Sequence, residues 1–225
     1  MPEPSVSQIR QPPPDCTRCP RLVSLRKHVR TERPNYHAAP VQAFGPADGR
    51  LLVVGLAPGM HGANATGRPF TGDRSGQLLF ETLYRQGLCS APVSVGPGDG
   101  LQLHDCRITN AVKCLPPGNR PVAAEINACN AFLRAEIEPA TVVLALGGLA
   151  HNAVVRALGL RRADHRFGHD IVHRLPAGQT LIDSYHCSRY NINTGRLTPA
   201  MLNRVFARAC RMIAGNGLPE PSMTP

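Results

Sequence analysis

The sequence predicts an α/β protein with a three-layer α/β/α architecture and a small, mainly parallel central sheet. Short apolar runs of strand length, such as 51–54 and 141–146, alternate along the chain with stretches of helical periodicity, and no segment is repeated. Polar loops that end at Asp73, Asn119 and Arg196 each follow an expected strand. Because the carboxyl ends of parallel strands meet at one edge of a sheet, we expect these three loops to open on the same side.

The chain of 225 residues is long enough to form one well-filled core. We expect a disordered, proline-rich N-terminal tail over residues 1–14, a single domain over 15–214 and a loose C-terminal tail over 215–225. No apolar run is long enough to span a bilayer, and the N-terminus lacks the apolar core of a signal peptide. These features favour a cytoplasmic protein without membrane contact, and we expect it to be a monomer.

The charge balance favours a polyanionic partner. The net charge is +10 and the isoelectric point is about 9.7. Lys27 and Lys113 are the only lysines, so arginine supplies nearly all of the positive charge. The planar guanidinium of arginine binds two phosphate oxygens at once, which makes it well suited to nucleic acid.

The individual elements follow from the apolar patterns. A basic helix is expected over 22–31, and the strand at 51–54 leads through a long loop into a helix over 77–88. In the latter helix Leu79 and Leu83 lie one turn apart. Residues 160–179 are basic and are expected to form a hairpin or a loop. The other elements expected are strands that begin at 107, 141 and 180 and helices over 122–137, 149–158 and 199–213.

Eight cysteines in a chain expected to be cytosolic argue for a metal or cluster site rather than for disulfides. Cys16 and Cys19 form a C-x-x-C pair, and Cys114 and Cys129 are separated by 14 residues. Cys129 belongs to an apolar stripe of the expected helix over 122–137, so it could also be a small buried hydrophobe. The spacing fits zinc and a 4Fe-4S cluster equally well. The remaining cysteines, interpreted as structural, are Cys89, Cys106, Cys187 and Cys210.

The loop after the first strand is the strongest candidate for a functional site. Its glycines allow the backbone to approach a ligand closely, and Asp73 or Ser75 could cap the next helix. The alternative is a glycine-rich connection without chemistry, but the loop carries polar and aromatic side chains without an apolar period that would bury them. These side chains are His61, Asn64, Arg68, Phe70 and Asp73.

Together the three loops resemble the uracil-DNA glycosylase superfamily, and most closely its iron–sulfur branch, family 5 or type B. The matching segments are GLAPGMHGANATGRPFTGDRSG at 55–76, TNAVKCLPPGNRP at 109–121 and YHCSRYNINTGRLT at 185–198. The resemblance covers the chain from Cys16 to about Ile213. It implies a uracil-DNA glycosylase-like fold and an enzyme that flips a deaminated base out of DNA and hydrolyses its N-glycosidic bond. Uracil, hypoxanthine, xanthine and modified uracils are the implied bases, and the abasic site that remains would initiate base excision repair.

The resemblance also assigns roles within the base pocket. Phe70 matches an aromatic residue that stacks on the flipped base, and Asn110 matches the asparagine that reads the amide edge of a pyrimidine. His186 matches a histidine near the O2 atom of the base, where a donor would stabilise charge on the leaving group. The alternatives are a core phenylalanine, a turn asparagine that bonds its own backbone and a core histidine at a strand end. The apolar first motif adds Gly55, Leu56 and Ala57 to the base-binding residues.

DNA and metal contacts follow in the same way. Arg189, Tyr190 and Asn191 would wedge into the duplex, whereas phosphate contacts are expected from Ser188, Asn193, Thr194 and Arg196. The four cysteines that occupy the positions of the branch's cluster ligands are Cys16, Cys19, Cys114 and Cys129. They imply a structural 4Fe-4S cluster, with zinc the less favoured occupant, that ties the N-terminal arm to the helix over 122–137.

One departure from the wider superfamily concerns the attacking water. Many relatives carry an acidic or amide residue in the first motif, but residues 55–58 are apolar here. We therefore expect His61 or Asn64 to hold the water, with Asp73 as the third candidate. The alternatives are a solvated histidine, a local turn and a helix cap.

Two other functions remain open from the sequence. The apolar first motif is compatible with a catalytically weak DNA-binding or cluster-binding protein that keeps the same fold. A zinc-stabilised α/β protein that binds a nucleotide or phosphate in the 55–76 loop is less favoured, because the loop lacks the Gly-Lys-Ser/Thr ending of a P-loop.

Overall fold

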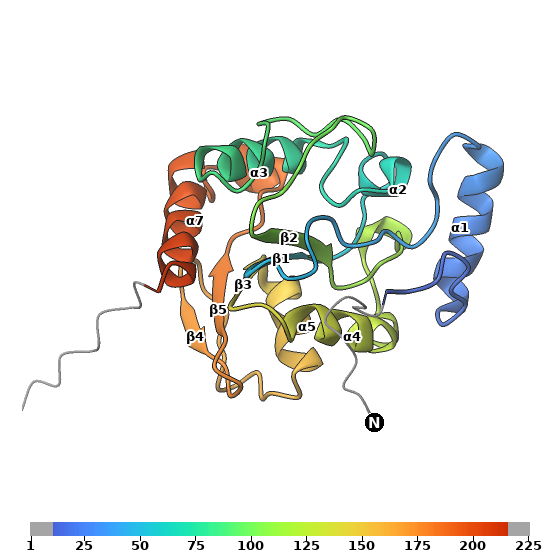
Figure 1. Ribbon diagram of the computed structural model, residues 1–225. Helices are drawn as coiled ribbons and strands as arrows, with labels where there is room; N and C mark the ends of the chain where they lie inside the picture. The colour runs from blue at the N-terminus through green and yellow to red at the C-terminus, as the bar shows by residue number, and fades with distance from the viewer. Residues whose placement is uncertain (1–10, 216–225) are drawn as a thin grey trace, which may run out of the picture.

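The computed structural model describes residues 11–215, in which a central sheet lies between two layers of helices (Figure 1). The tails expected over residues 1–14 and 215–225 therefore fall largely outside the described residues. Within the described part, Gln11 Nε2 donates to Glu136 Oε1 at 2.6 Å, and the carbonyl of Pro12 accepts from Gln42 Nε2 at 2.8 Å. Residues 11 and 12 thus pack against the domain, where the sequence had predicted disorder.

The sheet has five strands in the order β2-β1-β3-β5-β4. Its strands are β1 (Leu51–Gly55), β2 (Cys106–Asn110), β3 (Val142–Leu146), β4 (Val172–Arg174) and β5 (Thr180–Ser184). The pairs β1–β2, β1–β3 and β3–β5 are parallel, and only the short edge strand β4 runs antiparallel. The predicted fold class is therefore confirmed. The expected basic hairpin or loop over 160–179 contains β4 and the turn that joins it to β5.

The five predicted helices are present, and three short helical segments occur in addition where the sequence predicted loops. Their bounds are α1 (Pro20–Glu32), α2 (Ala63–Thr66), α3 (Arg74–Arg85), η1 (Pro117–Asn119), α4 (Ala123–Ile137), α5 (Gly148–Ala157), α6 (Arg189–Asn193) and α7 (Pro199–Ile213). Helix α3 begins three residues earlier than predicted because Asp73 caps it. Helix α4 begins after Val122, which is 48% exposed, so Val122 does not join the buried stripe that the sequence predicted. No helix among residues 11–215 is long and apolar enough to cross a membrane.

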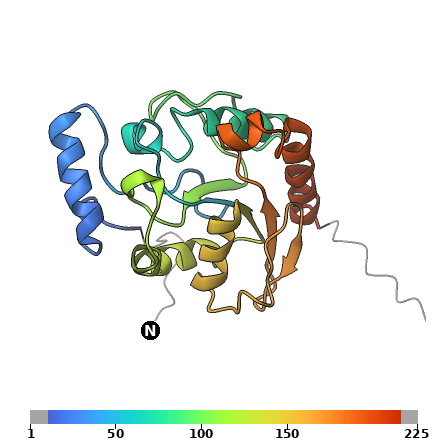
Figure 2. The same cartoon turned by 180° about the vertical axis from the view of Figure 1, so that it is seen from behind.

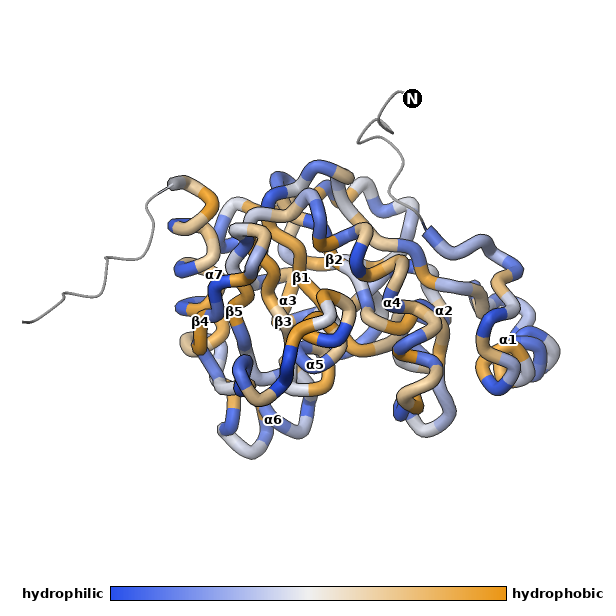
Figure 3. Tube along the Cα trace, turned by 90° about the horizontal axis from the view of Figure 1, so that it is seen from below, coloured by the Kyte–Doolittle hydropathy of each residue, from blue (hydrophilic) through white to orange (hydrophobic). Residues whose placement is uncertain are grey.

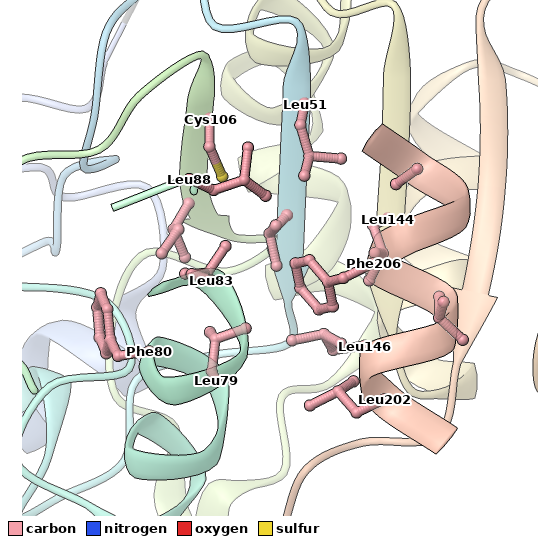
Figure 4. Close-up of a cluster of buried hydrophobic side chains, with 14 of the residues drawn as sticks. Leu51, Leu79, Phe80, Leu83, Leu88, Cys106, Leu144, Leu146, Leu202 and Phe206 are labelled. Carbon is pink, nitrogen blue, oxygen red and sulfur yellow. The ribbon is translucent and has the colours of Figure 1, made fainter. Parts of the chain in front are cut away.

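The strand residues alternate between two apolar layers. Leu51 and Leu144 face the side covered by α3 and α7, where Leu79 and Phe206 pack against them (Figure 4). Leu52 and Val143 face the opposite layer, formed by α4 and α5. Figure 3 shows the hydrophobic residues concentrated along the strands, and the view from behind in Figure 2 places α1 at the flank opposite α7. The two layers pack around the four parallel strands, whose carboxyl ends lie at one edge of the sheet.

Candidate active site

A cavity of about 510 Å³ lies at the carboxyl edge of the sheet. Its walls come from the ends of β1, β2, β3 and β5, at the point where the chain order reverses on either side of β1. Ligands bind at such a point in open α/β sheets. The predicted convergence of the three polar loops is therefore confirmed. Six of the predicted catalytic and base-binding residues line this cavity: Leu56, Ala57, Phe70, Asp73, Asn110 and His186. Three of the predicted DNA-contacting residues, Ser188, Asn191 and Arg196, line it as well.

The glycine that ends β1 makes room for the two principal side chains of the cavity. A Cβ on Gly55 would lie 2.5 Å from Asn110 Oδ1 and 2.6 Å from Phe70 Cζ, closer than any side chain can approach. Asn110 is the last residue of β2 and pairs with Gly55 across the sheet, while the Phe70 ring comes from the long loop that follows β1. The absence of a side chain at Gly55 thus lets the aromatic ring and the amide close over the strand end.

Phe70 is held in an unusual backbone conformation. Its φ is +54°, a region that non-glycine residues seldom adopt and that is often found at functional sites. A Cβ on Gly76 would lie 1.7 Å from the carbonyl oxygen of Phe70, so the first turn of α3 packs directly against this peptide. The ring is only 7% exposed, and its centroid lies 6.1 Å from that of His186.

Arg68 anchors the same loop from beneath. Its Nη1 lies 2.8 Å from both carboxylate oxygens of Asp99 and 2.9 Å from Ser94 Oγ, and its guanidinium stacks on the Phe44 ring at 4.4 Å. Burial alone would raise the pKa of Asp99, but the bond from Arg68 and three backbone N–H groups hold it well below its ordinary value. The loop over residues 90–100, for which the sequence predicted no role, therefore stabilises the loop that carries Phe70.

His186 follows β5 and faces the cavity from the other side. Burial lowers its pKa below the ordinary value, and the carboxylate of Asp73 offsets part of that shift. The His186 carbonyl accepts from Asn191 Nδ2 at 2.8 Å, and a Cβ on Gly147 would lie 3.1 Å from His186 Cβ. The ring is therefore neutral near pH 7, and its backbone is fixed by α6 and by the end of β3.

The three residues predicted to hold the attacking water lie in different places in the structure. Asp73 lines the cavity; its Oδ1 accepts from the backbone N–H of Gly76 at 3.0 Å and caps α3. His61 is exposed, bonds the Tyr36 hydroxyl through Nδ1 at 2.8 Å and does not line the cavity. Asn64 is buried but does not line the cavity, and its backbone carbonyl accepts from Ala38 N at 3.0 Å. The structure thus brings only Asp73 of these three to the base pocket.

The loop after His186 forms the short helix α6 at the mouth of the cavity. Ser188 caps this helix by accepting from Asn191 N at 3.3 Å, and Tyr190 is 71% exposed. Arg196 lies over the Tyr185 ring at 4.6 Å. A second cavity of about 240 Å³ lies beside α6, between Arg74 and Arg189. The predicted DNA-contacting residues that are exposed on this surface are Arg189, Tyr190, Asn193, Thr194 and Arg196.

The four predicted ligand cysteines gather in one place, between α1 and the start of α4. Burial, together with the nearby thiols of Cys129, Cys16 and Cys19, raises the pKa of Cys114 to about 12. Burial likewise raises the pKa of Cys19 to about 11, with contributions from Cys129 and Cys16. Arg26 reaches into the group, with Nη1 4.0 Å from Cys114 Sγ and Nη2 3.1 Å from the carbonyl of Cys16. Four thiols with a neighbouring cation suit a metal centre that binds cysteines as thiolates.

Other residues of the cavity wall were not predicted. Gly147 and Gly148 follow β3, while Phe167 and Tyr185 come from the chain that flanks β4 and β5. A signal for the glycines was present, because they follow the apolar run 141–146 as Gly55 follows the run 51–54. No local pattern marked Phe167, which reaches the cavity through contacts with residues distant in sequence.

A buried group of ionisable side chains was also missed. Asp183 on β5 bonds His151 Nδ1 at 2.7 Å and His173 Nε2 at 3.2 Å, and neither Asp183 nor His151 is exposed to solvent. Burial by itself would lower the pKa of His151, but the hydrogen bond and charge of Asp183 raise it above its ordinary value. One ligand atom from each of the three residues lies within 4.8 Å of the others, as in a metal site, yet each is already engaged in a hydrogen bond. We therefore interpret the group as a hydrogen-bonded network.

Comparison with known proteins identifies the family. The sequence pattern of the "Uracil DNA glycosylase superfamily" matches residues 42–209. The chain belongs to the uracil-DNA glycosylase superfamily. It is similar to the type-5 uracil-DNA glycosylase of Mycobacterium leprae, with 45% identity over 211 residues that cover 89% of this chain and 92% of the relative. The type-5 enzymes of Thermus thermophilus (44% identity; 88% of this chain, 93% of the relative) and Pyrobaculum aerophilum (46%; 87% and 88%) are similar to a comparable degree. The predicted family and the predicted enzyme class, a uracil-DNA glycosylase, are confirmed.

A more distant relationship links this uracil-DNA glycosylase to type-4 enzymes. The type-4 uracil-DNA glycosylase of Thermotoga maritima is 37% identical over 138 residues, which cover 60% of this chain and 58% of the relative. The greater coverage of the type-5 enzymes agrees with the apolar first motif, which the sequence resemblance associates with family 5.

Proposed function

We propose that this protein flips uracil and other deaminated bases out of DNA and hydrolyses the N-glycosidic bond, leaving an abasic site for base excision repair. One observation carries the proposal: an aromatic ring, an amide, a neutral imidazole and a carboxylate line a single cavity at the carboxyl edge of the sheet. Hypoxanthine, xanthine and modified uracils are the further substrates that we assign to it.

Recognition of the base rests on Phe70 and Asn110. An extruded base that stacks on the Phe70 ring gains about 1–3 kcal/mol of binding free energy. The amide of Asn110 can donate to a base carbonyl and accept from the adjacent ring N–H, which matches the edge of a deaminated base. Asn110 is buried within the end of β2, so its amide is already oriented before DNA binds.

Departure of the base is assisted by His186. When the N-glycosidic bond breaks, negative charge develops on the base, and a preorganised donor at the carbonyl oxygen stabilises it. The lowered pKa of His186 keeps its ring neutral, so one ring nitrogen donates a hydrogen bond without the cost of burying a full positive charge.

Asp73 is the residue that we assign to the attacking water. Its Oδ1 is bound by Gly76 N, so Oδ2 is the oxygen that remains to accept a hydrogen bond from water. The sugar carries positive charge in an oxocarbenium-like transition state, which the carboxylate also stabilises. Such a reaction needs only a weak nucleophile, so the apolar wall of Leu56 and Ala57 is compatible with turnover and with several base shapes.

The four gathered cysteines would hold a 4Fe-4S cluster. We assign the cluster rather than zinc because the four cysteines occupy the positions of the cluster ligands in the iron–sulfur branch that the sequence resembles. The cluster would supply a covalent link between Cys16 and Cys19 near α1 and Cys114 and Cys129 near α4. Hydrolysis transfers no electron, so we assign it no catalytic step.

A glycosylase assay on DNA duplexes tests the proposal. The purified protein is incubated with duplexes that contain a single uracil, hypoxanthine or xanthine, and alkali then breaks the strand at each abasic site. We expect cleavage at all three bases, and Phe70→Ala should reduce the rate about 10- to 100-fold through loss of stacking. Phe70→Tyr keeps a stacking ring and serves as the matched control. A folded protein that cleaves none of the duplexes would favour the DNA-binding alternative instead.

A further inference from the structure

The segment over residues 165–173 contributes one side chain to the base cavity, although it belongs to none of the three motif loops. Phe167 lines the same cavity as Phe70. Its ring lies against the start of α5, where a Cβ on Gly148 would be 3.3 Å from Phe167 Cδ1. The Phe167 and Tyr185 ring centroids are 6.2 Å apart, so two aromatic rings form this side of the cavity.

The chain on both sides of Phe167 is bonded to the buried network. His151 Nε2 lies 2.8 Å from the carbonyl of His165, two residues before Phe167, and a carbonyl oxygen can only accept. Gly168 N, one residue after Phe167, donates to Asp183 Oδ2 at 3.4 Å. The His151 ring also meets the Phe167 ring edge to face, with centroids 5.7 Å apart. The network therefore clamps the peptide that carries Phe167.

The hydrogen bonds of the network indicate that His151 and Asp183 form a charged pair. Both nitrogens of the His151 ring face acceptors, Asp183 Oδ1 and the His165 carbonyl, so the ring carries a proton on each. Asp183 balances this charge and also bonds His173. Burying such a pair costs desolvation free energy that apolar residues of the same size would not, and buried ion pairs can be retained because they fix one geometry.

We propose that Phe167 is a further substrate-contacting residue, an aromatic face against which the extruded nucleotide packs, and that Asp183 and His151 are its positioning residues. The inference rests on the proposed glycosylase function and adds a substrate contact from a segment outside the three motifs. The Phe70 ring binds the base from the loop after β1, and Phe167 closes the cavity from the side of β5.

Single-turnover cleavage of a uracil-containing duplex tests the contact. We expect Phe167→Ala to raise the half-saturating protein concentration about tenfold and to lower the maximal rate less, whereas Phe167→Tyr stays close to the parent protein. Equal constants for Phe167→Ala and the parent protein would overturn the inference. If the parent protein itself cleaves no uracil duplex, the proposed function fails, and this result is distinct from an active parent with a silent Phe167→Ala.

A double-mutant cycle tests the positioning role. Asp183→Asn should raise the half-saturating concentration about fivefold, and it should add nothing in a Phe167→Ala background, because both changes remove the same contact. Additive effects would show that Asp183 does not act through Phe167. His104→Gln changes an exposed histidine outside the network, and it should remain within about twofold of the parent. If Asp183→Asn does not fold, as judged by circular dichroism, His151→Gln replaces it in the same cycle.

Discussion

At the residue scale, Gly55 contributes to the base pocket because it has no side chain. The ring of Phe70 and the amide of Asn110 both occupy the space that a Cβ at this position would take. The φ of Gly55 is not positive, so the strand geometry alone would permit any residue there. The requirement for glycine therefore comes from the base pocket and not from the backbone.

Gly55→Ala should consequently reduce uracil excision by at least about a hundredfold, since displacing catalytic groups by about 1 Å has that effect. Overpacking at the end of β1 should also cost about 1–3 kcal/mol of unfolding free energy. Single-turnover rates and thermal melting measure the two effects. Gly98→Ala is the control, because a Cβ there meets no atom within 4 Å, and it should change neither quantity. Activity within threefold of the parent protein in Gly55→Ala would contradict this account of the pocket.

His186 makes the pH dependence of the reaction predictable. Its pKa is lowered by burial, so the neutral ring persists below pH 6.5 and is lost only as the pH falls through that lowered pKa. We expect the single-turnover rate to be constant from pH 6.5 to 8 and to decline on the acid side of this window. His186→Gln keeps a donor that does not titrate, so its rate should be lower and the acid decline should disappear. An unchanged acid decline in that variant would assign it to another group.

At the scale of elements, the cysteine site lies where the N-terminal arm and α1 meet α4, next to the ion pair of Arg21 with Glu125 at 2.7 Å. Helix α1 lies at the flank of the molecule, whereas α4 packs on the sheet (Figure 1). Leu22 from α1, Val112 after β2 and Phe132 from α4 form a small apolar cluster around Cys129. A bound 4Fe-4S centre would add a covalent link to this apolar cluster and to the contacts that Arg18 and Arg21 make with the α4 region.

Cys129→Ser should therefore abolish visible absorption near 400 nm and lower the melting temperature. A link from Cys19 to Cys114 closes a loop of roughly a hundred residues, and a cross-link of that span stabilises by about 4–5 kcal/mol, or roughly 10 °C. Cys210→Ser, which alters a partly buried thiol outside the site, should keep both the absorption and the melting temperature. Retention of the chromophore in Cys129→Ser would remove Cys129 from the ligand set.

Some parts of the fold and of the site could be predicted from the sequence, and others could not. Strands and helices could be predicted because their apolar periods are local. Asn110 and His186 could be placed because one ends a strand and the other closely follows one, and Phe70 could be placed through the resemblance of its loop to the family motif. Phe167 could not, since its position depends on bonds from His151 and Asp183, residues 16 positions away on either side. His61 and Asn64 share a loop with Phe70, but loop membership does not determine which way a side chain points. Only the folded loop separates them from Asp73.

At the scale of the whole molecule, the two edges of the sheet have different roles. The carboxyl edge carries the base cavity, α6 and the second cavity beside it, which Arg74 and Arg189 line. At the amino edge, Arg50 precedes β1, forms an ion pair with Asp105 and bonds the carbonyl of Ile213 at the end of α7. The positive charge of the protein should thus act on DNA mainly from the carboxyl edge, although the net charge of +10 belongs to the whole chain.

Salt dependence of DNA binding can distinguish local contacts from overall charge. The logarithm of the association constant should fall linearly with the logarithm of salt concentration, and each lost phosphate contact should reduce the slope by about one. We expect Arg189→Gln to reduce the slope in this way, because Arg189 lines the second cavity beside α6. Arg211→Gln removes the same charge from the last turn of α7, near the amino edge, and should leave the slope unchanged. Equal changes in the two variants, measured by fluorescence anisotropy on an abasic-site duplex, would mean that DNA responds to net charge and not to the carboxyl edge.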